Sequence, residues 1–291
     1  MLADAPGDDR RGLALVADLL RCPVTAHEEE APLAADPAGR RLECGGGHRF
    51  DLARQGYANL LGHAQQANAD TADMVAARER FLGAGHYAAL TAAVADRLAD
   101  LPGRAAVLET GAGTAHHLAG VLSGRPAWRG LATDVSVPAC RRAARAHPRL
   151  GAVVADVWRP WPVRTGALDA VLAVFAPRNA EETARVLAPG GVLVVVTPEP
   201  GHLAELRADG ALLGIEDSKV ERLRAQLAGR FAEEEVVGVH RVLDLDAGAT
   251  RDLVAMGPNG HHLGAEELTR RWSRPTRTTL QVRVARYCRT G

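Results

Sequence analysis

Beyond about residue 100, short apolar runs alternate with helical patterns, and this alternation restricts the fold more than any other feature of the chain. The runs are rich in aliphatic residues and bounded by Gly, Pro or Asp, which is typical of buried strands. Strands that alternate with helices predict an α/β fold with a parallel sheet and crossover connections. The predicted strands are Ala105–Leu108, Gly130–Thr133, Ala152–Ala155, Ala170–Val174 and Gly191–Thr197, with helices such as Pro138–Ala146 and Glu181–Leu187 between them.

Three other segments add detail to this sheet and its surroundings. Pro189-Gly190-Gly191 is a turn signal directly before the last of these strands. Residues Thr279–Arg286 alternate roughly between apolar and polar side chains, so we expect them to form an edge strand. The polar, Ala-rich stretch 62–72 is the most linker-like part of the chain.

The composition is that of a soluble globular protein. Hydrophobic residues make up 47% and charged residues 24%, which excludes a disordered, collagenous or disulfide-dense chain. The 291 residues predict about two domains. Thirty-five basic residues balance 35 acidic ones, so contact with nucleic acid would need a local basic patch. No apolar run reaches the ~20 residues of a membrane span and no signal-peptide layout is present, so we expect a cytoplasmic protein without a membrane partner.

A glycine-rich turn follows the first predicted strand. Glu109, Gly111 and Gly113 lie between this strand and the start of a helix. Glycines allow close approach of a ligand to the backbone, and the N-terminus of the following helix favours an anionic group. Asp134 ends the next strand, where a carboxylate can bind both hydroxyls of a ribose, and Asp156 follows the third strand, where it can accept an adenine amino group. A tight β–α turn without any ligand is the simpler alternative.

The spacing distinguishes between two nucleotide cofactors. A dinucleotide fingerprint requires a third glycine where this chain has His116. The Glu109-x-Gly111-x-Gly113 pattern instead resembles motif I of class I S-adenosylmethionine-dependent methyltransferases, and Leu187–Leu193 resembles their late L-x-P-G-G-x-L segment. The resemblance covers about residues 105–198. It implies a Rossmann-like methyltransferase sheet that binds S-adenosyl-L-methionine, with Glu109 near the methionine end, Asp134 at the ribose and Asp156 at the adenine.

The N-terminal segment carries an incomplete metal-binding pattern. Cys22, Cys44 and His48 have the spacing of three ligands of a tetrahedral structural zinc site. Thr25 stands where the fourth ligand, a cysteine, is expected, and His27 can supply that ligand after a change of register. A zinc-free loop packed on the methyltransferase domain is the alternative. The two other cysteines, at positions 140 and 288, fit packing positions in a helix and a strand.

The string that follows carries the most specific resemblance. Residues 50–61 (FDLARQGYANLL), 70–87 (DTADMVAARERFLGAGHY), 174–179 (VFAPRN) and the Thr197-Pro…His202-Leu pattern resemble the RlmA family of 23S rRNA guanine-N1 methyltransferases over about residues 14–290. The chain is most similar to the actinobacterial branch associated with resistance to macrolides of the tylosin and mycinamicin type. The resemblance implies methylation of guanine 748, or guanine 745, in a 23S rRNA hairpin. Thr25 departs from the family pattern.

The resemblance also implies a domain division and further site residues. We expect a zinc-finger-like RNA-recognition domain over 1–62, a helical connection over 63–100 and a class I methyltransferase domain over 101–291. By resemblance, Tyr87, the His117-Leu118 pair and His202 contact the cofactor. Without the family, Tyr87 fits a core aromatic residue, His117 a residue in the first turn of a helix, and His202 a residue at a helix start.

The segment after the fourth strand indicates the type of target atom. It lacks the Asn/Asp-Pro-Pro-Tyr/Phe motif of enzymes that methylate exocyclic adenine amines, and has Phe175, Pro177, Arg178 and Asn179 instead. These residues are candidates to stack on and hydrogen-bond an extruded guanine. Phe175 fits the core equally well. The N1 proton of guanine must leave during the reaction, and no spacing singles out a general base.

The arginines are concentrated in two regions. Residues 125–164 hold eight arginines and two acidic residues, and 265–291 hold seven arginines and two acidic residues. These clusters fit a basic face for RNA, although solvated helix faces would also contain such arginines. The prediction is therefore an rRNA methyltransferase, which can form a homodimer. A methyltransferase of small natural products and a non-catalytic RNA-binding module are the alternatives.

Overall fold

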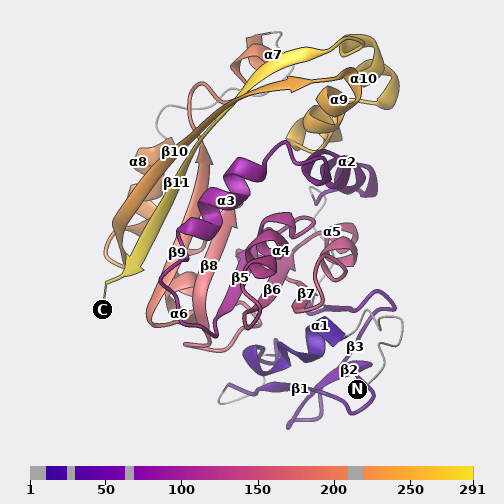
Figure 1. The fold of residues 1–291 in the computed structure, drawn as a ribbon. Coiled ribbons are helices and arrows are strands. Elements are labelled where there is room, and N and C mark those ends of the chain that lie inside the picture. The colour runs from indigo at the N-terminus through magenta and orange to yellow at the C-terminus, as the bar shows by residue number, and fades with distance from the viewer. Residues whose placement is uncertain (1–10, 25–29, 63–68, 209–218, 291) are drawn as a thin grey trace.

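The computed structural model describes residues 11–24, 30–62, 69–208 and 219–290, and its centre is one eight-stranded mixed sheet (Figure 1). The strand order is β10-β11-β9-β8-β5-β6-β7-β4. All neighbours from β9 to β4 are parallel, whereas β11 is antiparallel to both β9 and β10. The strands are β4 (Tyr57–Asn59), β5 (Ala106–Thr110), β6 (Arg129–Asp134), β7 (Leu150–Val154), β8 (Leu168–Val174), β9 (Leu187–Pro198), β10 (Phe231–Leu245) and β11 (Thr276–Arg289).

The five predicted central strands and the α/β fold are therefore confirmed. The prediction of an edge strand at Thr279–Arg286 is wrong, because β11 pairs on both sides and β10 forms the edge. Leu280, Val282 and Val284 are fully buried, as expected for an interior strand. The predicted turn before the fifth strand is an irregularity within β9, where Gly190 has a φ of +79° and the pairing with β8 shifts register.

Helices cover both faces of the sheet, because successive side chains of each strand point to opposite faces and both sets are apolar. Val107 of β5 packs with Leu118 in one core cluster, whereas Leu108 packs with Val186 in the other. Side-chain oxygens cap four of the helices: Thr71, Ser136, Asn179 and Asp246 each accept a backbone N–H of α2, α5, α6 or α9. The helices are α2 (Ala72–Gly83), α3 (Ala88–Asp96), α4 (His116–Ser123), α5 (Val137–Ala143), α6 (Ala180–Val186), α7 (Ala204–Ala208), α8 (Lys219–Leu227), α9 (Ala247–Ala255) and α10 (Ala265–Arg271), with a 3-10 turn, η2, at Pro258–His261.

The N-terminal part forms a small antiparallel sheet next to the large one (Figure 1, bottom). The N-terminal part packs closely on the large sheet because glycines without side chains lie at the contact. Gly12 lies against the backbone of Leu150, and Gly151 lies against α1. Asp18 forms a bidentate ion pair with Arg129 at 2.5 and 2.7 Å. β4 belongs to the first 62 residues but pairs with β7 of the large sheet. The elements of this part are α1 (Arg11–Ala14), the 3-10 turn η1 (Ala17–Leu19), β1 (Leu33–Ala35), β2 (Arg41–Cys44) and β3 (Arg49–Asp51).

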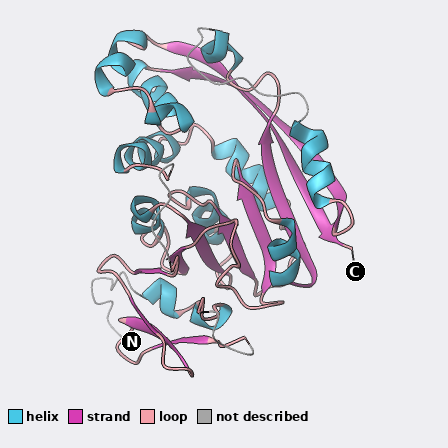
Figure 2. Ribbon diagram, turned by 180° about the vertical axis from the view of Figure 1, so that it is seen from behind, coloured by secondary structure: helices cyan, strands magenta, loops and turns pink. Residues whose placement is uncertain are grey.

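β10 and β11 extend past the rest of the sheet and carry α9 and α10 between them, which Figure 2 shows from behind. This extension packs on α2. Arg80 of α2 forms an ion pair with Asp252 at 2.6 Å, and Nη2 of Arg78 donates to the carbonyl of Met256 at 2.6 Å. Within the described part of the chain, every helix is too short or too polar to cross a membrane.

Candidate functional site

The glycine turn between β5 and α4 has the conformation that its sequence predicts. Gly111, Gly113 and Ala115 all have a φ near +55°, in the left-handed region that glycine tolerates best. A Cβ atom on Gly111 would lie 2.8 Å from the Cβ of Ala176, and one on Gly113 would lie 2.8 Å from Nη1 of Arg78. The turn therefore leaves no room for a side chain at Gly111, and a side chain at Gly113 would have to displace the guanidinium of Arg78.

Three carboxylates lie at the carboxyl ends of neighbouring strands. Glu109 near the end of β5 is buried, and its Oε2 accepts the N–H of Leu118 at 3.1 Å. Asp134 ends β6, and its two oxygens accept the N–H groups of Gly113 and Ser136, both at 2.8 Å. Asp156 follows β7 and is buried. The structure thus brings the glycine turn and the three acidic residues to one edge of the sheet.

Burial shifts the pKa of two of these carboxyls, those of Glu109 and Asp134. It raises the pKa of Glu109 to about 8, opposed by the hydrogen bond from Leu118, so this carboxyl is largely protonated at neutral pH. Burial also raises the pKa of Asp134, while the N–H groups of Ser136 and Gly113 favour its charged form. A positive charge bound near these two carboxyls would stabilise their ionised forms.

The family-implied residues lie around the same turn. Tyr87 is buried at the start of α3, 5.1 Å from the ring of Phe81 in an edge-to-face arrangement. His117 is buried in the first turn of α4, and burial lowers its pKa to about 3, so its imidazole is neutral. Its Nδ1 lies 2.8 Å from Oγ1 of Thr91. Leu118 is fully buried beneath the turn.

The segment after β8 places an aromatic ring at the surface. Phe175 is 42% exposed and has a φ of +54°, a strained conformation for a bulky residue. Its ring stacks on His202, with centroids 5.7 Å apart, and lies 6.4 Å from the ring of Tyr87. Nδ1 of His202 accepts the backbone N–H of Gln281 at 3.3 Å.

The other three base-pocket candidates differ in their surroundings. Pro177 is exposed next to the glycine turn. Nη1 of Arg178 donates to the carbonyl of Ala176 at 3.2 Å, and burial lowers the pKa of Arg178. The amide of Asn179 caps α6 through Oδ1 and donates to the carbonyl of Val157 at 3.1 Å through Nδ2. Asn179 therefore already joins the loops that follow β7 and β8.

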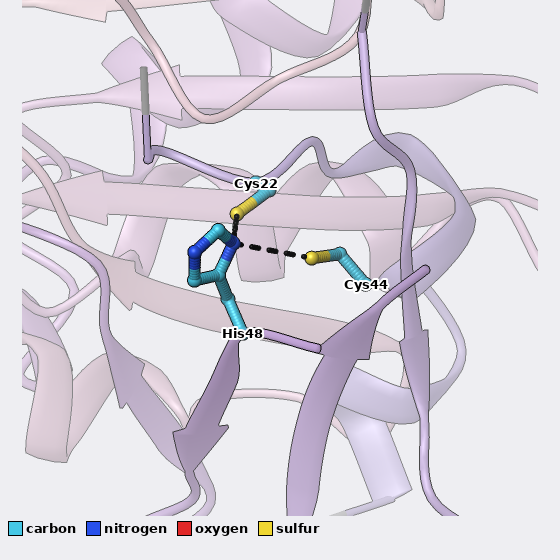
Figure 3. A group of neighbouring side chains, drawn as sticks. All are labelled: Cys22, Cys44 and His48. Atoms are coloured by element: carbon cyan, nitrogen blue, oxygen red, sulfur yellow. Dashed lines mark hydrogen bonds between the residues drawn. The ribbon is translucent and has the colours of Figure 1, made fainter. Parts of the chain in front are cut away.

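Figure 3 shows the N-terminal trio, Cys22, Cys44 and His48, converging on one point. Both sulfur atoms lie 3.5 Å from Nδ1 of His48, and all three donor atoms lie within 4.8 Å of one another. Two ligands of a tetrahedral zinc ion, one sulfur and one nitrogen, are about 3.6 Å apart, given Zn–S and Zn–N bonds of about 2.3 and 2.05 Å. The trio therefore fits a zinc ion. Thr25 and His27, the fourth-ligand candidates, lie outside the described residues.

Sequence reasoning did not identify Arg78, which lies against the glycine turn. Nη1 of Arg78 forms an ion pair with Asp70, and Nη2 bonds Met256 in the C-terminal extension. Ser136 is a second omission: its hydroxyl donates to the carbonyl of Asp70 at 2.7 Å and accepts the N–H of Ala139. Their roles depend on contacts between distant parts of the chain, which no local motif records.

A groove of about 250 Å³ lies between the start of α2 and α5. Its lining is basic, because three arginines contribute to it, and Arg142 also forms an ion pair with Glu79 at 3.2 Å. α5 starts three residues after Asp134, so the groove neighbours the glycine turn. The lining residues are Ala72, Pro138, Arg141, Arg142 and Arg145.

Comparisons with known proteins give consistent results. Residues 20–67 match the zinc-ribbon family described as RlmA, N-terminal. A Streptomyces fradiae protein named 23S rRNA (guanine(748)-N(1))-methyltransferase is 49% identical over 266 residues, 88% of this chain and 90% of that protein. A Micromonospora griseorubida protein, provisionally named 23S rRNA (guanine-N(1)-)-methyltransferase, is 44% identical over 92% of this chain and 96% of its own length.

Among solved structures, a chain of the complex between the Haloferax volcanii Trm112 methyltransferase activator and a methyltransferase superposes with a TM-score of 0.50. It covers 76% of this chain and 99% of that chain at 19% identity, and so supports the fold alone.

Proposed function

Because the chain belongs to the RlmA family of 23S rRNA guanine-N1 methyltransferases, we propose that it transfers a methyl group from S-adenosyl-L-methionine to N1 of guanine 748 in 23S rRNA. The observation that carries this proposal is the 49% identity to the Streptomyces fradiae enzyme over nearly the whole of both chains. That enzyme's name favours guanine 748 over guanine 745. Macrolide resistance, a cytoplasmic location and action on an rRNA hairpin follow as parts of the same proposal.

The site can bind the cofactor with groups that the sequence already identified. S-adenosyl-L-methionine supplies an electrophilic methyl group. The protein therefore has to bind the cofactor, orient the target atom toward the methyl group, and exclude water. In the proposal, Asp134 accepts hydroxyl protons of the ribose, Asp156 accepts the adenine amino group, and Glu109 faces the methionine end. Their common position at the carboxyl edge of β5, β6 and β7 supports these roles. Gly111, Gly113, Tyr87, His117, Leu118 and His202 complete the proposed cofactor site.

Phe175 is the proposed stacking partner of the target guanine. A bulky residue with a φ of +54° is strained, and such strain occurs where function requires a particular orientation. The half-exposed ring lies beside His202 at the same edge as the carboxylates. Pro177 and Arg178 follow in the same loop, and Asn179 holds that loop to the one after β7. An extruded base can therefore stack on Phe175 close to the cofactor site.

The transfer itself provides the test of this function. Purified protein and radiolabelled S-adenosyl-L-methionine should label a synthetic hairpin that carries guanine 748, and the same hairpin with adenine at that position should stay unlabelled. A methyltransferase of small natural products would label neither hairpin. A non-catalytic RNA-binding module would bind the hairpin but leave it unlabelled.

The basic groove between α2 and α5 is the proposed contact with RNA phosphates. Replacing Arg141, Arg142 and Arg145 together with Ala should lower the affinity for the hairpin and reduce the slope of log affinity against log salt by about 2 to 3, because each phosphate contact contributes about 0.9 or less. Binding of S-adenosylhomocysteine should stay unchanged. Filter binding at several salt concentrations measures the slope. Replacement of Arg222 and Arg241, at the opposite edge of the sheet, is the matched control, and an unchanged slope in the triple variant would remove the groove from the RNA path.

Zinc in the N-terminal sheet is proposed to be structural. Cys44→Ser should abolish bound zinc and destabilise the protein by several kcal/mol, because Cys44 is a buried member of the trio and structural zinc contributes free energy of folding. Affinity for S-adenosylhomocysteine should change less than about twofold, since the trio lies at the small N-terminal sheet and the glycine turn follows β5 of the large sheet. Metal analysis, thermal unfolding and calorimetry measure these effects, with Cys288→Ser as the control thiol. Loss of methyl transfer after chelation in a fully folded, RNA-binding protein would indicate a catalytic metal instead.

We propose that the chain can form a homodimer, and that it does so through the edge strand β10. This edge strand exposes Val236 and Val242 and has no partner on its outer side among the described residues. Sedimentation velocity of the purified chain measures the oligomeric state.

A further inference from the structure

The tryptophans differ sharply in exposure. Trp128, Trp161 and Trp272 are 2–4% exposed, whereas Trp158 is 59% exposed. Trp158 and Phe175 are the two large aromatic side chains among the exposed hydrophobic residues of the described chain. An exposed indole loses the stabilisation of burial, so its position on the molecule calls for an explanation.

The backbone that carries Trp158 is fixed on both sides. Its N–H donates to Oδ1 of Asp156 at 2.9 Å, and the N–H of Arg159 donates to the carbonyl of Asp156 at 3.1 Å. The carbonyl of Val157 accepts two bonds, from Nε1 of Trp161 at 3.0 Å and from Nδ2 of Asn179 at 3.1 Å. The indole therefore projects into solvent from a rigid loop, so little backbone freedom would be lost when a flat ligand stacks on it.

The position of the loop indicates what such a ligand is. Trp158 follows β7 by four residues, and Asn179 bonds this loop to the one that carries Phe175. Two exposed aromatic rings are thus presented by two joined loops at the carboxyl edge of the sheet. The exposed guanidinium of Arg159, next to Trp158, makes no ion pair with any described residue. An exposed aromatic ring with an exposed cation at the next residue of the same loop is a combination that can bind an unstacked nucleotide, by its base and its phosphate.

We propose that Trp158 is a second stacking platform, which receives an unpaired base of the rRNA next to the target guanine, with Arg159 on the neighbouring phosphate. The inference rests on the proposed rRNA function and extends it, because it assigns a residue for the base beside the target. One platform for the extruded guanine and another for its neighbour would keep the strand from restacking around the gap.

Tryptophan fluorescence tests the proposal directly, because the other three indoles are buried and RNA can stack only on Trp158. Adding the guanine 748 hairpin to the full-length protein should quench the emission, and S-adenosylhomocysteine alone should not. Trp158→Phe should abolish the quenching but keep hairpin affinity within about threefold, since a phenyl ring still stacks. Trp158→Ala should weaken hairpin binding roughly 5- to 100-fold. Both variants should bind S-adenosylhomocysteine normally, and Leu15→Ala, which shortens another exposed apolar side chain, is the matched control.

The outcomes separate this inference from the function on which it rests. Quenching by S-adenosylhomocysteine alone would place Trp158 against the cofactor and overturn the proposal. Normal hairpin binding and methylation by wild-type protein, with neither quenching nor an effect of Trp158→Ala, would overturn the proposal alone. Failure of wild-type protein to bind the hairpin in a gel-shift assay would overturn the rRNA function and this inference together.

Discussion

Asp134→Ala should weaken binding of S-adenosylhomocysteine by about 30- to 150-fold, which corresponds to about 2–3 kcal/mol for a charge-assisted pair of hydrogen bonds. The carboxylate of Asp134 is held in place by the N–H groups of Gly113 and Ser136, each at 2.8 Å. In the proposed cofactor site, these bonds orient its remaining lone pairs toward the ribose hydroxyls. Isothermal titration calorimetry of the purified variant measures the loss.

Asp169→Ala is the matched control for this experiment. Its carboxylate also accepts a backbone N–H, from Ala106 at 2.8 Å, but lies at the opposite, amino end of β5. The two variants should lose comparable thermal stability, and only Asp134→Ala should lose affinity for the cofactor product. Equal affinity in wild-type protein and Asp134→Ala would show that the ribose binds elsewhere.

Glu109 should release a proton when the cofactor binds. Its pKa of about 8 in the free protein leaves it mostly protonated at pH 7. The ammonium and sulfonium charges of S-adenosyl-L-methionine would favour the carboxylate and lower this pKa. Affinity should therefore rise with pH by as much as tenfold per unit below pH 8 and level off above it. Calorimetry at pH 7 in buffers of different ionisation enthalpy measures the release, which should approach one proton per site.

Glu109→Gln distinguishes proton release by Glu109 from proton release by other groups. The amide retains the size of the carboxyl and cannot ionise, so proton release and the pH slope of affinity should fall.

The pH dependence of stability gives a second measurement, because the pKa of Glu109 is higher in the folded protein than in the unfolded chain. The unfolded chain ionises first, so wild-type protein without cofactor should lose stability as pH rises from about 4.5 to 8, by up to a few kcal/mol. The variant should lose less over that range, and identical proton release in both proteins would assign the proton to another group.

The central sheet could be predicted from the sequence because local patterns encode it. Each strand from β5 to β9 is an apolar run bounded by turn residues, and Gly111 and Gly113 mark a turn that needs a positive φ. The three metal-ligand candidates at positions 22, 44 and 48 converge as their spacing predicts. The strands and the turn depend on residues close in sequence, and the trio depends on the spacing between ligand pairs of a metal-binding motif.

The features that depend on distant contacts could not be predicted. The alternating pattern of β11 is compatible with an edge or an interior strand, and the pairing with β10 decides between them. β4 is too short to identify, and it is a strand because β7 pairs with it. Arg78 reaches Gly113 and Met256 only in the folded chain. The exposure of Trp158 depends on the bonds that hold its loop, one of which comes from the distant Asn179, a contact that no local pattern records.

Mass mapping of methyl groups on 23S rRNA tests the central claim most directly. The rRNA is isolated from a host that lacks the modification, with the protein expressed or absent, and Gly111→Val serves as the inactive control because its side chain would collide with Ala176. We expect one additional methyl group, on N1 of guanine 748, only with the wild-type protein. An unmodified guanine 748 in the presence of folded, cofactor-binding protein, or a methyl group at another atom of that base, would contradict the account.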